Sequence, residues 1–361
     1  MIYMDHAATT PMRPCALWNM QKVAERFWGN PSSVHTMGRE AAQELERCRQ
    51  TIADCINCDP AEVFFTSGAT ESCNWIIRYL HSRFLNCDNA VYGNIKQEHA
   101  AVYEAALAPH GELPALTVCM LANNETGQIF QKQIMDVKQL SSLHMTAPLF
   151  VDATAAVGHI PVDFKELGCD YMAFSGHKFG AAKGVGCLIA KTGSLLSPML
   201  LGGYQEGGFR AGTENLPGIA SMAYALKDAC NNMAAEQAKV IPMRDELILG
   251  IKDIPDCVLN GAWTEGLCTD RLPGNVNFSF RGVDGEKLVT MLDIDYGICA
   301  STGSACHSGK GERSRVIYDL HHDEELARGS LRLTLSHQNA MDEVETVISA
   351  VKECVERLHQ S

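Results

Sequence analysis

The sequence predicts an α/β protein with a mostly parallel central sheet and a smaller α+β domain at its C-terminal end. Between residues 60 and 180, short apolar runs alternate with helical segments, which is the pattern of a parallel sheet covered on both faces. After residue 255 the strands become shorter and are mixed with helices. The 361 residues suffice for one large and one smaller domain. We therefore expect a large domain over 13–254 and a small domain formed by 1–12 and 255–361.

The individual elements follow from local signals in chain order. Residues 13–28 are predicted to form a helix because a glycine and a proline follow directly, and residues 37–55 form a second helix. Apolar runs predict strands of the large domain at 62–66, 90–93, 116–121, 147–151, 171–174 and 184–190. Two helices, at 217–235 and from there to 254, are expected to close this domain. The small domain is expected to contain elements at 276–280, 284–293, 298–301, 331–335 and 344–358.

The composition argues against several classes of function. The net charge is −13, and a phosphate backbone needs basic surface, so we expect no direct nucleic-acid partner. No apolar run has the length of a membrane span and the N-terminus has no signal-peptide pattern, so we expect no membrane association and a cytoplasmic location. Fifteen cysteines in such a chain indicate mostly free thiols. The CxxC motif at 55–58 has no second pair at zinc spacing, so no metal site is expected.

Two predicted strands end in side chains that suit a carbonyl cofactor. The run 171–174 leads into His177 and Lys178, and the run 147–151 leads into Asp152. In an open α/β sheet, ligands bind beyond the carboxyl ends of the strands. A lysine there can form a Schiff base with pyridoxal phosphate, and the ring nitrogen of that cofactor needs an acidic partner. Either residue alone is better explained as a surface lysine or a helix N-cap, but the two strand ends together favour the cofactor.

Further polar positions follow other strands. The turn 67–70 joins a strand to a helix, and such a helix start can hold a phosphate, although a plain N-cap has the same pattern. His99 lies at a predicted helix start, where histidine is more often structural. Asn123 and Asn124 end a strand and suit either a polar ligand or a simple turn. The glycine-rich segment 202–215 is typical of a long, exposed functional loop.

Cys306 is the candidate nucleophile of the chain. It lies in the segment 301–313, whose residues are mostly small, polar or glycine and cannot form a packed core. An inert buried cysteine has apolar neighbours instead, as Cys119 and Cys187 do. The segment therefore predicts an accessible thiol on a mobile loop.

These motifs together resemble the cysteine desulfurases, the pyridoxal-phosphate enzymes of the class V aminotransferase group. The resemblance runs from residue 3 to the last helix and includes Ser-Gly-His-Lys at 175–178, Arg-Ala-Gly-Thr-Glu-Asn at 210–215 and Gly-Ser-Ala-Cys at 303–306. Its other parts are the stretches 3–11, 29–35, 66–72, 98–102, 123–127, 151–154 and 330–332. It implies the fold type I of pyridoxal-phosphate-dependent transferases and the desulfurase type with a mobile cysteine loop.

The resemblance also implies roles for individual residues. Lys178 would hold pyridoxal 5'-phosphate as an aldimine, Asp152 would pair with the ring nitrogen, and His99 would stack on the ring and take part in acid–base steps. Cys306 would take sulfur from L-cysteine as a persulfide and leave L-alanine. The phosphate would be bound by Ala69, Thr70, Ser175 and His177, with Thr213 contributed from the other subunit of a homodimer. Asn124 and Arg332 would bind near the ring oxygen and the substrate carboxylate, respectively.

One position departs from the family pattern. The Asp-Ala-Thr run is commonly followed by a glutamine that binds the cofactor's ring oxygen, and here that position is Ala155. We expect weakened or re-tuned activity. The sulfur would serve an acceptor protein for iron–sulfur clusters or tRNA thiolation. The alternatives are a selenocysteine lyase, a weakly active or non-catalytic sulfur-transfer scaffold, and a class V aminotransferase. The intact Lys178 and Cys306 argue against the scaffold, and the loop with Cys306 argues against the aminotransferase, because transamination needs no nucleophile there.

Overall fold

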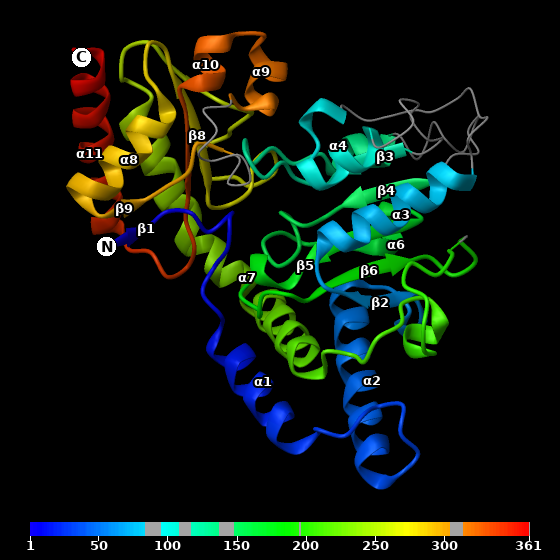
Figure 1. Cartoon of the computed structure of the whole chain (residues 1–361). Helices are drawn as coiled ribbons and strands as arrows, with labels where there is room; N and C mark the ends of the chain where they lie inside the picture. Colours follow the sequence, from blue (N-terminus) through cyan, green and yellow to red (C-terminus); the bar gives the residue numbers. More distant parts are fainter. Residues whose placement is uncertain (84–94, 108–116, 137–147, 195, 304–312, 361) are drawn as a thin grey trace.

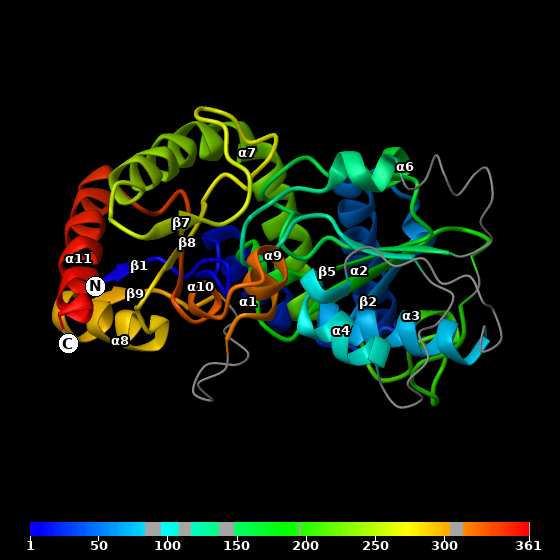
Figure 2. The same cartoon turned by 90° about the horizontal axis from the view of Figure 1, so that it is seen from above.

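The computed structural model describes residues 1–83, 95–107, 117–136, 148–194, 196–303 and 313–360. Within this part of the chain, a central sheet lies between two layers of helices, and a smaller sheet with its own helices lies beside it (Figure 1). Both ends of the chain lie beside the last helix: Figure 1 shows the C-terminus at one end of this helix and the N-terminus near the other, and the two labels come close only in the view from above (Figure 2). None of the described helices combines the length and the apolar character that crossing a bilayer requires.

The central sheet has mixed strand directions. Its described strands follow the order β2-β6-β5-β4-β3, with bounds β2 Val63–Thr66, β3 Thr117–Met120, β4 Leu149–Asp152, β5 Tyr171–Ser175 and β6 Gly186–Ala190. The β3–β4 and β4–β5 pairs are parallel as expected, but β6 runs antiparallel to both of its neighbours. The prediction of a mostly parallel sheet is confirmed, since four of the five described strands (β2, β3, β4 and β5) run in the same direction and only β6 is reversed. The short β5–β6 connection cannot hold the crossover that a parallel pair needs. The strand predicted at 90–93 lies outside the described residues.

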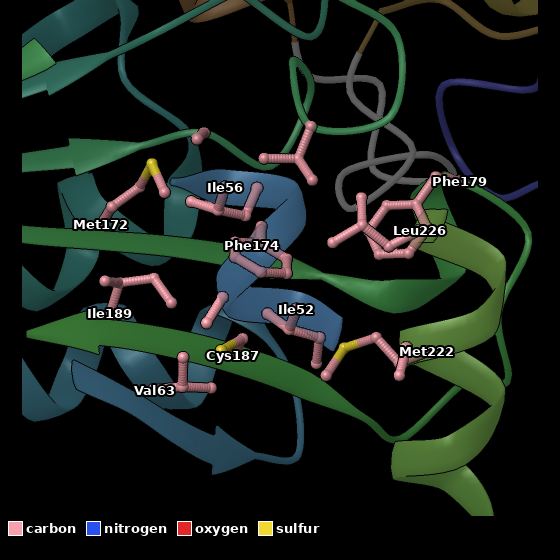
Figure 3. Close-up of a cluster of buried hydrophobic side chains, with 14 of the residues drawn as sticks. Ile52, Ile56, Val63, Met172, Phe174, Phe179, Cys187, Ile189, Met222 and Leu226 are labelled. Carbon is pink, nitrogen blue, oxygen red and sulfur yellow. The ribbon is translucent and has the colours of Figure 1, made fainter. Parts of the chain in front are cut away.

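Both faces of this sheet are buried, and successive residues of each strand alternate between them. One face packs against α3 (Ala69–Arg83) and α4 (Ala100–Leu107) through side chains such as Phe150, Tyr171 and Leu188. The other face packs against α2 (Thr36–Ile56), α6 (Phe164–Leu167) and the first part of α7 (Leu216–Ile251), and α1 (Pro14–Arg26) packs on α7 in the same core. Figure 3 shows this second core, with Phe174 and Met172 of β5 against Ile52 and Ile56 of α2.

Helix α7 joins the two halves of the molecule. The sequence predicted two helices here, but the structure has one continuous helix that contains Pro242. Residues up to Leu226 belong to the core beneath the central sheet, whereas Val240 and the residues that follow it belong to the core of the smaller sheet. Burial in two cores stabilises both halves of the helix, although a proline removes one backbone hydrogen bond. The domain boundary at residue 254 stays a prediction.

The smaller sheet contains β10 (Ser330–Thr334), β8 (Asn275–Phe280) and β7 (Cys257–Leu259), which are antiparallel and in this order. It packs against α8 (Gly285–Tyr296) and α11 (Met341–His359), and α9 (Arg315–His321) and α10 (Glu324–Arg328) follow the segment 304–312. The N-terminal strand β1 (Ile2–Tyr3) pairs with β9 (Ile298–Cys299). This pairing brings residues 5–8 to the junction between the two sheets, where the candidate site lies.

Candidate active site

A cavity of about 270 Å³ opens at the carboxyl ends of β4 and β5, between the two sheets. Its volume is near the lower end of the range of ligand pockets, which begins at about 300 Å³. The cavity is lined by nine of the eleven site residues that the sequence predicted: Ala69, Thr70, His99, Asn124, Asp152, Ser175, His177, Lys178 and Arg332. Thr213 lines a different, smaller cavity, and Cys306 lies outside the described residues.

Asp152 and Lys178 lie at the same edge of the sheet because they end neighbouring parallel strands. Asp152 is the last residue of β4 and pairs with Ala173 of β5. Lys178 ends the single 3₁₀ turn, η3 (Gly176–Lys178), that follows β5. Asp152 is buried, and its Oδ1 accepts a hydrogen bond from the Thr154 amide at 2.9 Å. The Lys178 ammonium donates to the carbonyl oxygens of Ala7 at 2.6 Å and Ala8 at 3.1 Å.

The start of α3 forms a cradle for an anion. The Ala69 amide is among the first N–H groups of this helix and donates to the Ser175 hydroxyl at 2.7 Å. A side chain at Gly186 would come within 2.4 Å of the backbone of Gly68, so only glycine lets β6 approach this turn. Burial, together with the charge of Lys178, lowers the pKa of His177 to about 4. His177 is therefore neutral near pH 7 and can donate or accept a hydrogen bond beside the helix N-terminus.

His99 and Asn124 form the opposite wall. His99 precedes α4, and its Nδ1 accepts a hydrogen bond from the Ala101 amide at 3.1 Å, so the proton of the neutral ring is on Nε2. Of the two asparagines at the end of β3, Asn123 makes the turn, since its Oδ1 accepts from the amides of Glu125 and Thr126. Asn124 lines the cavity. The sequence left both uses of this pair open; the structure shows that Asn123 forms the turn, and the binding role of Asn124 stays a prediction.

Arg332 of β10 reaches the cavity from the smaller sheet. Its side chain is 2% exposed, and it forms an ion pair with Asp5, with Nη2 at 2.8 Å from Oδ1. Nη1 donates to the carbonyl oxygens of Asn124 (2.9 Å) and Gly303. Nε is buried and has no hydrogen-bond partner among the described residues. Three protein oxygens therefore fix the guanidinium, and its Nε–H group has no acceptor among the described residues.

The sequence reasoning missed the contribution of the N-terminal segment. His6, Ala7 and Ala8 line the cavity, and the Asp5 carboxylate contacts Arg332. These contacts connect residues about 170 to 330 positions apart in the chain, so no local pattern indicated them. The only available signal was the family resemblance of residues 3–11. The sequence reasoning also missed His159, whose ring contacts the Lys178 carbonyl oxygen at 3.0 Å.

Glu98, beside Asp152 and directly before His99, is another residue that the sequence reasoning missed. Its Oε1 accepts from the Met120 amide at 2.8 Å, whereas its Oε2 is buried without a hydrogen-bond partner among the described residues. Burial and the charge of Asp152 raise the pKa of Glu98 to about 8. The carboxyl group is therefore largely protonated at neutral pH, which avoids a second buried negative charge next to Asp152.

The donors in the cavity fit pyridoxal phosphate. A helix N-terminus with Thr70, Ser175 and His177 suits its phosphate, a buried carboxylate suits its ring nitrogen, and a lysine amine suits its aldehyde. The methyl group of Ala155 is part of the lining, so this side chain adds no donor at the position where a glutamine was expected.

About half of the residues of the glycine-rich loop are exposed, and two ion pairs attach the loop to the body of the protein: Arg210 with Glu71 of α3, and Glu206 with Arg49. Glu206, in the 3₁₀ turn η4 (Gln205–Gly208), accepts from Arg49 of α2 at 2.8 Å, and the two side chains are 2% and 11% exposed. Glu206 also accepts from the Phe65 amide at 3.0 Å. This attachment holds the loop against β2, and the exposed Thr213 lies a few residues further along it.

Comparison with known proteins identifies the family. The aminotransferase class-V family model matches residues 2–111 and 110–347. The chain is 34% identical to the IscS-like cysteine desulfurase of Mycobacterium tuberculosis over 100% of this chain and 98% of the relative. It is also 34% identical to the cysteine desulfurase IscS of Methanosarcina thermophila, over 99% and 92% of the two chains.

Solved structures agree with the sequence comparison. A NifS-like protein superposes with a TM-score of 0.85 at 28% identity, over 99% of each chain. The apo cysteine desulfurase of Thermococcus onnurineus has the same fold, with a TM-score of 0.83 at 21% identity, over 99% of this chain and 95% of that chain. The chain therefore belongs to the aminotransferase class-V family of pyridoxal-phosphate enzymes, and within it to the relatives of the cysteine desulfurases.

Proposed function

We propose that the protein is a cysteine desulfurase that removes sulfur from L-cysteine, leaving L-alanine and a persulfide on Cys306. The observation that carries this proposal is the meeting of Lys178, Asp152 and an anion cradle in one cavity, in a chain whose full-length relatives are cysteine desulfurases. Bound pyridoxal phosphate would supply the electron-withdrawing ring and the aldehyde that this chemistry needs.

Each of the cavity residues would have its own role in this reaction. Lys178 would hold the cofactor through its amine and would move protons at Nζ. Asp152 would keep a proton on the ring nitrogen. His99 would stack on the ring, and its Nδ1 accepts from the Ala101 amide. Ala69, Thr70, Ser175 and His177 hold the phosphate, Asn124 lies near the ring oxygen, and Arg332 binds the substrate carboxylate.

The sulfur transfer needs a thiolate. Cys306 attacks the substrate sulfur, a sulfur–sulfur bond forms, and the carbon–sulfur bond breaks with its electron pair left on the substrate carbon. A proton then completes L-alanine. Because the thiolate and not the thiol is the nucleophile, the reaction is expected to slow when Cys306 is protonated. A thiol reductant or an acceptor protein removes the sulfur from the persulfide.

The protein would act as a homodimer that passes its sulfur to an acceptor protein for iron–sulfur clusters or tRNA thiolation. Thr213 supports the dimer, because it lies outside the cavity of its own chain and is exposed on the glycine-rich loop. From there it would reach the cofactor phosphate of the partner subunit. Exposed apolar side chains on and after α1 (Leu17, Trp18 and Trp28) offer a surface for a second copy.

The test is to measure sulfide and L-alanine released from L-cysteine in the presence of dithiothreitol, together with the visible absorbance of the cofactor-loaded protein. Wild type should release the two products in equal amounts. Cys306→Ala should retain the cofactor absorbance and release neither product. Cys268→Ala is the matched control, since this cysteine is partly exposed and does not line the cavity, and it should behave as wild type.

Three results would contradict the proposal. Faster turnover of selenocysteine, with little sulfide from cysteine, would favour a selenocysteine lyase. Product formation that survives in Cys306→Ala would exclude the assigned nucleophile. A protein that takes up no added pyridoxal phosphate would favour a scaffold that keeps only the fold.

A further inference from the structure

The N-terminal segment contacts both cationic residues of the cavity. The carbonyl oxygens of Ala7 and Ala8 accept from the Lys178 ammonium, and the Asp5 carboxylate forms the ion pair with Arg332. The segment is itself held firmly: the Tyr3 hydroxyl donates to the carbonyl oxygens of Asp5 and Thr9, at 3.2 and 2.9 Å. Asp5 also forms a parallel bridge with Thr334, two residues beyond Arg332 on β10. Asp5 thus has a fixed position relative to the strand that carries Arg332.

The hydrogen bonds of Arg332 leave a defined set of donors. A guanidinium has five N–H groups in one plane: one on Nε and two on each terminal nitrogen. Both N–H groups of Nη1 have carbonyl acceptors, in Asn124 and Gly303, and one N–H group of Nη2 has Asp5. The remaining donors are Nε–H, which has no partner among the described residues, and the second N–H of Nη2. These two belong to neighbouring nitrogens and match the two oxygens of a carboxylate.

We propose that Asp5 is a positioning residue for the substrate carboxylate: it holds Nη2 of Arg332 so that Nε and the second N–H of Nη2 stay available for that carboxylate. This inference rests on the proposed function, and it explains why the enzyme would select amino acids over amines that have no carboxylate. The Asp5 carboxylate also balances the Arg332 charge, which is buried in the smaller sheet with a side-chain exposure of 2%. Without Asp5, the guanidinium would keep only its two contacts through Nη1 and could rotate away from the substrate.

The test compares ligands with and without a carboxylate. Isothermal titration calorimetry gives the dissociation constants of L-alanine and of ethylamine, its carboxylate-free analogue, for the cofactor-loaded protein. In Asp5→Ala the L-alanine constant should rise roughly tenfold, the loss expected for one charge-assisted orienting contact. The ethylamine constant should stay within about twofold. Asp5→Asn keeps an acceptor oxygen at the same place and should give an intermediate value, and L-cysteine turnover should show a higher KM at an unchanged kcat.

The matched control is Asp228→Ala. Asp228 also forms an ion pair with a buried arginine at 2.8 Å, with Arg13, but lies outside the cavity, so its loss should not change the ratio of the two dissociation constants. Equal losses for L-alanine and ethylamine in Asp5→Ala would mean that Asp5 only supports the fold, and would overturn the proposal. Tighter L-alanine binding in Asp5→Asn would overturn it too, because Asp5 would then compete with the substrate carboxylate.

The calorimetric test does not depend on desulfurase activity. If wild type binds L-alanine more tightly than ethylamine but releases no sulfide from L-cysteine, the proposed function fails and the role of Asp5 is still measured. If wild type binds both ligands equally, the carboxylate site itself is absent and the role of Asp5 is refuted, whatever the protein does with cysteine.

Discussion

Glu98 should make the protein less stable as the pH rises from 5 to 8. Its carboxyl group is buried, and burial together with the charge of Asp152 raises its pKa from the ordinary 4.5 to about 8. The unfolded chain therefore releases this proton above pH 4.5, whereas the native protein keeps it up to about pH 8. Between these values the native state binds more protons than the unfolded state, so the free energy of unfolding falls with rising pH.

The size of this effect follows from the two pKa values. Each pH unit within the window costs about 1.4 kcal/mol, and the flattening near both ends reduces the total between pH 5 and pH 8 to about 3 kcal/mol. Glu98→Gln has nearly the same shape, keeps an oxygen that can accept from the Met120 amide, and cannot ionise. Between pH 5 and pH 8, the free energy of unfolding of the variant should therefore rise by about 3 kcal/mol relative to that of wild type. This change with pH does not depend on any difference between the two proteins at pH 5.

The assay is urea unfolding of the cofactor-free protein at several pH values, followed by circular dichroism. Glu25→Gln, on the exposed side of α1, is the matched control and should follow the wild-type pH dependence. Infrared spectroscopy adds an independent measurement, because a protonated buried carboxyl group has a distinct carbonyl band that should be lost near pH 8 and be missing in Glu98→Gln. A constant difference between wild type and Glu98→Gln across the pH range would refute the reasoning.

Three further predictions concern other parts of the site and the fold. Ala155→Gln adds a donor to the cavity wall and should move the midpoint of the pH-dependent visible absorbance of the loaded protein by roughly one pH unit; an unchanged titration would contradict a role for this position. Arg49→Ala leaves the buried Glu206 carboxylate without its cation and should lower the free energy of unfolding, measured in urea, by about 3 kcal/mol. The control Arg357→Ala removes an exposed ion pair and should lower it by less than about 1 kcal/mol. Burial lowers the pKa of His6 to about 4, so the native protein resists protonation of this ring and loses stability as the pH falls from 6.5 to 4. In urea titrations, His6→Asn should remove about 3 kcal/mol of that loss. An unchanged loss of stability between pH 6.5 and 4 in the variant would exclude His6 as its source.

The strand ends were the part of the site that sequence reasoning could reach. Asp152 and Lys178 follow apolar runs, and neighbouring parallel strands of a sheet bring their carboxyl ends together, so a one-dimensional pattern already implied that the two residues meet. The start of α3 was predictable for the same reason, because it follows a strand of the same sheet. By contrast, only the structure showed that Asn123 forms the turn while Asn124 lines the cavity.

The sequence by itself therefore determined the α/β class, most elements and the core of the candidate site, because hydrophobic periodicity and strand-end chemistry are local properties. Only the tertiary structure decided the direction of β6, the continuity of α7 through two cores, the protonated state of Glu98 and the contacts of Asp5 with Arg332. Each of these depends on burial or on a contact between residues far apart in the chain. Burial and distant contacts arise only when the whole chain is folded, so no local pattern carries them.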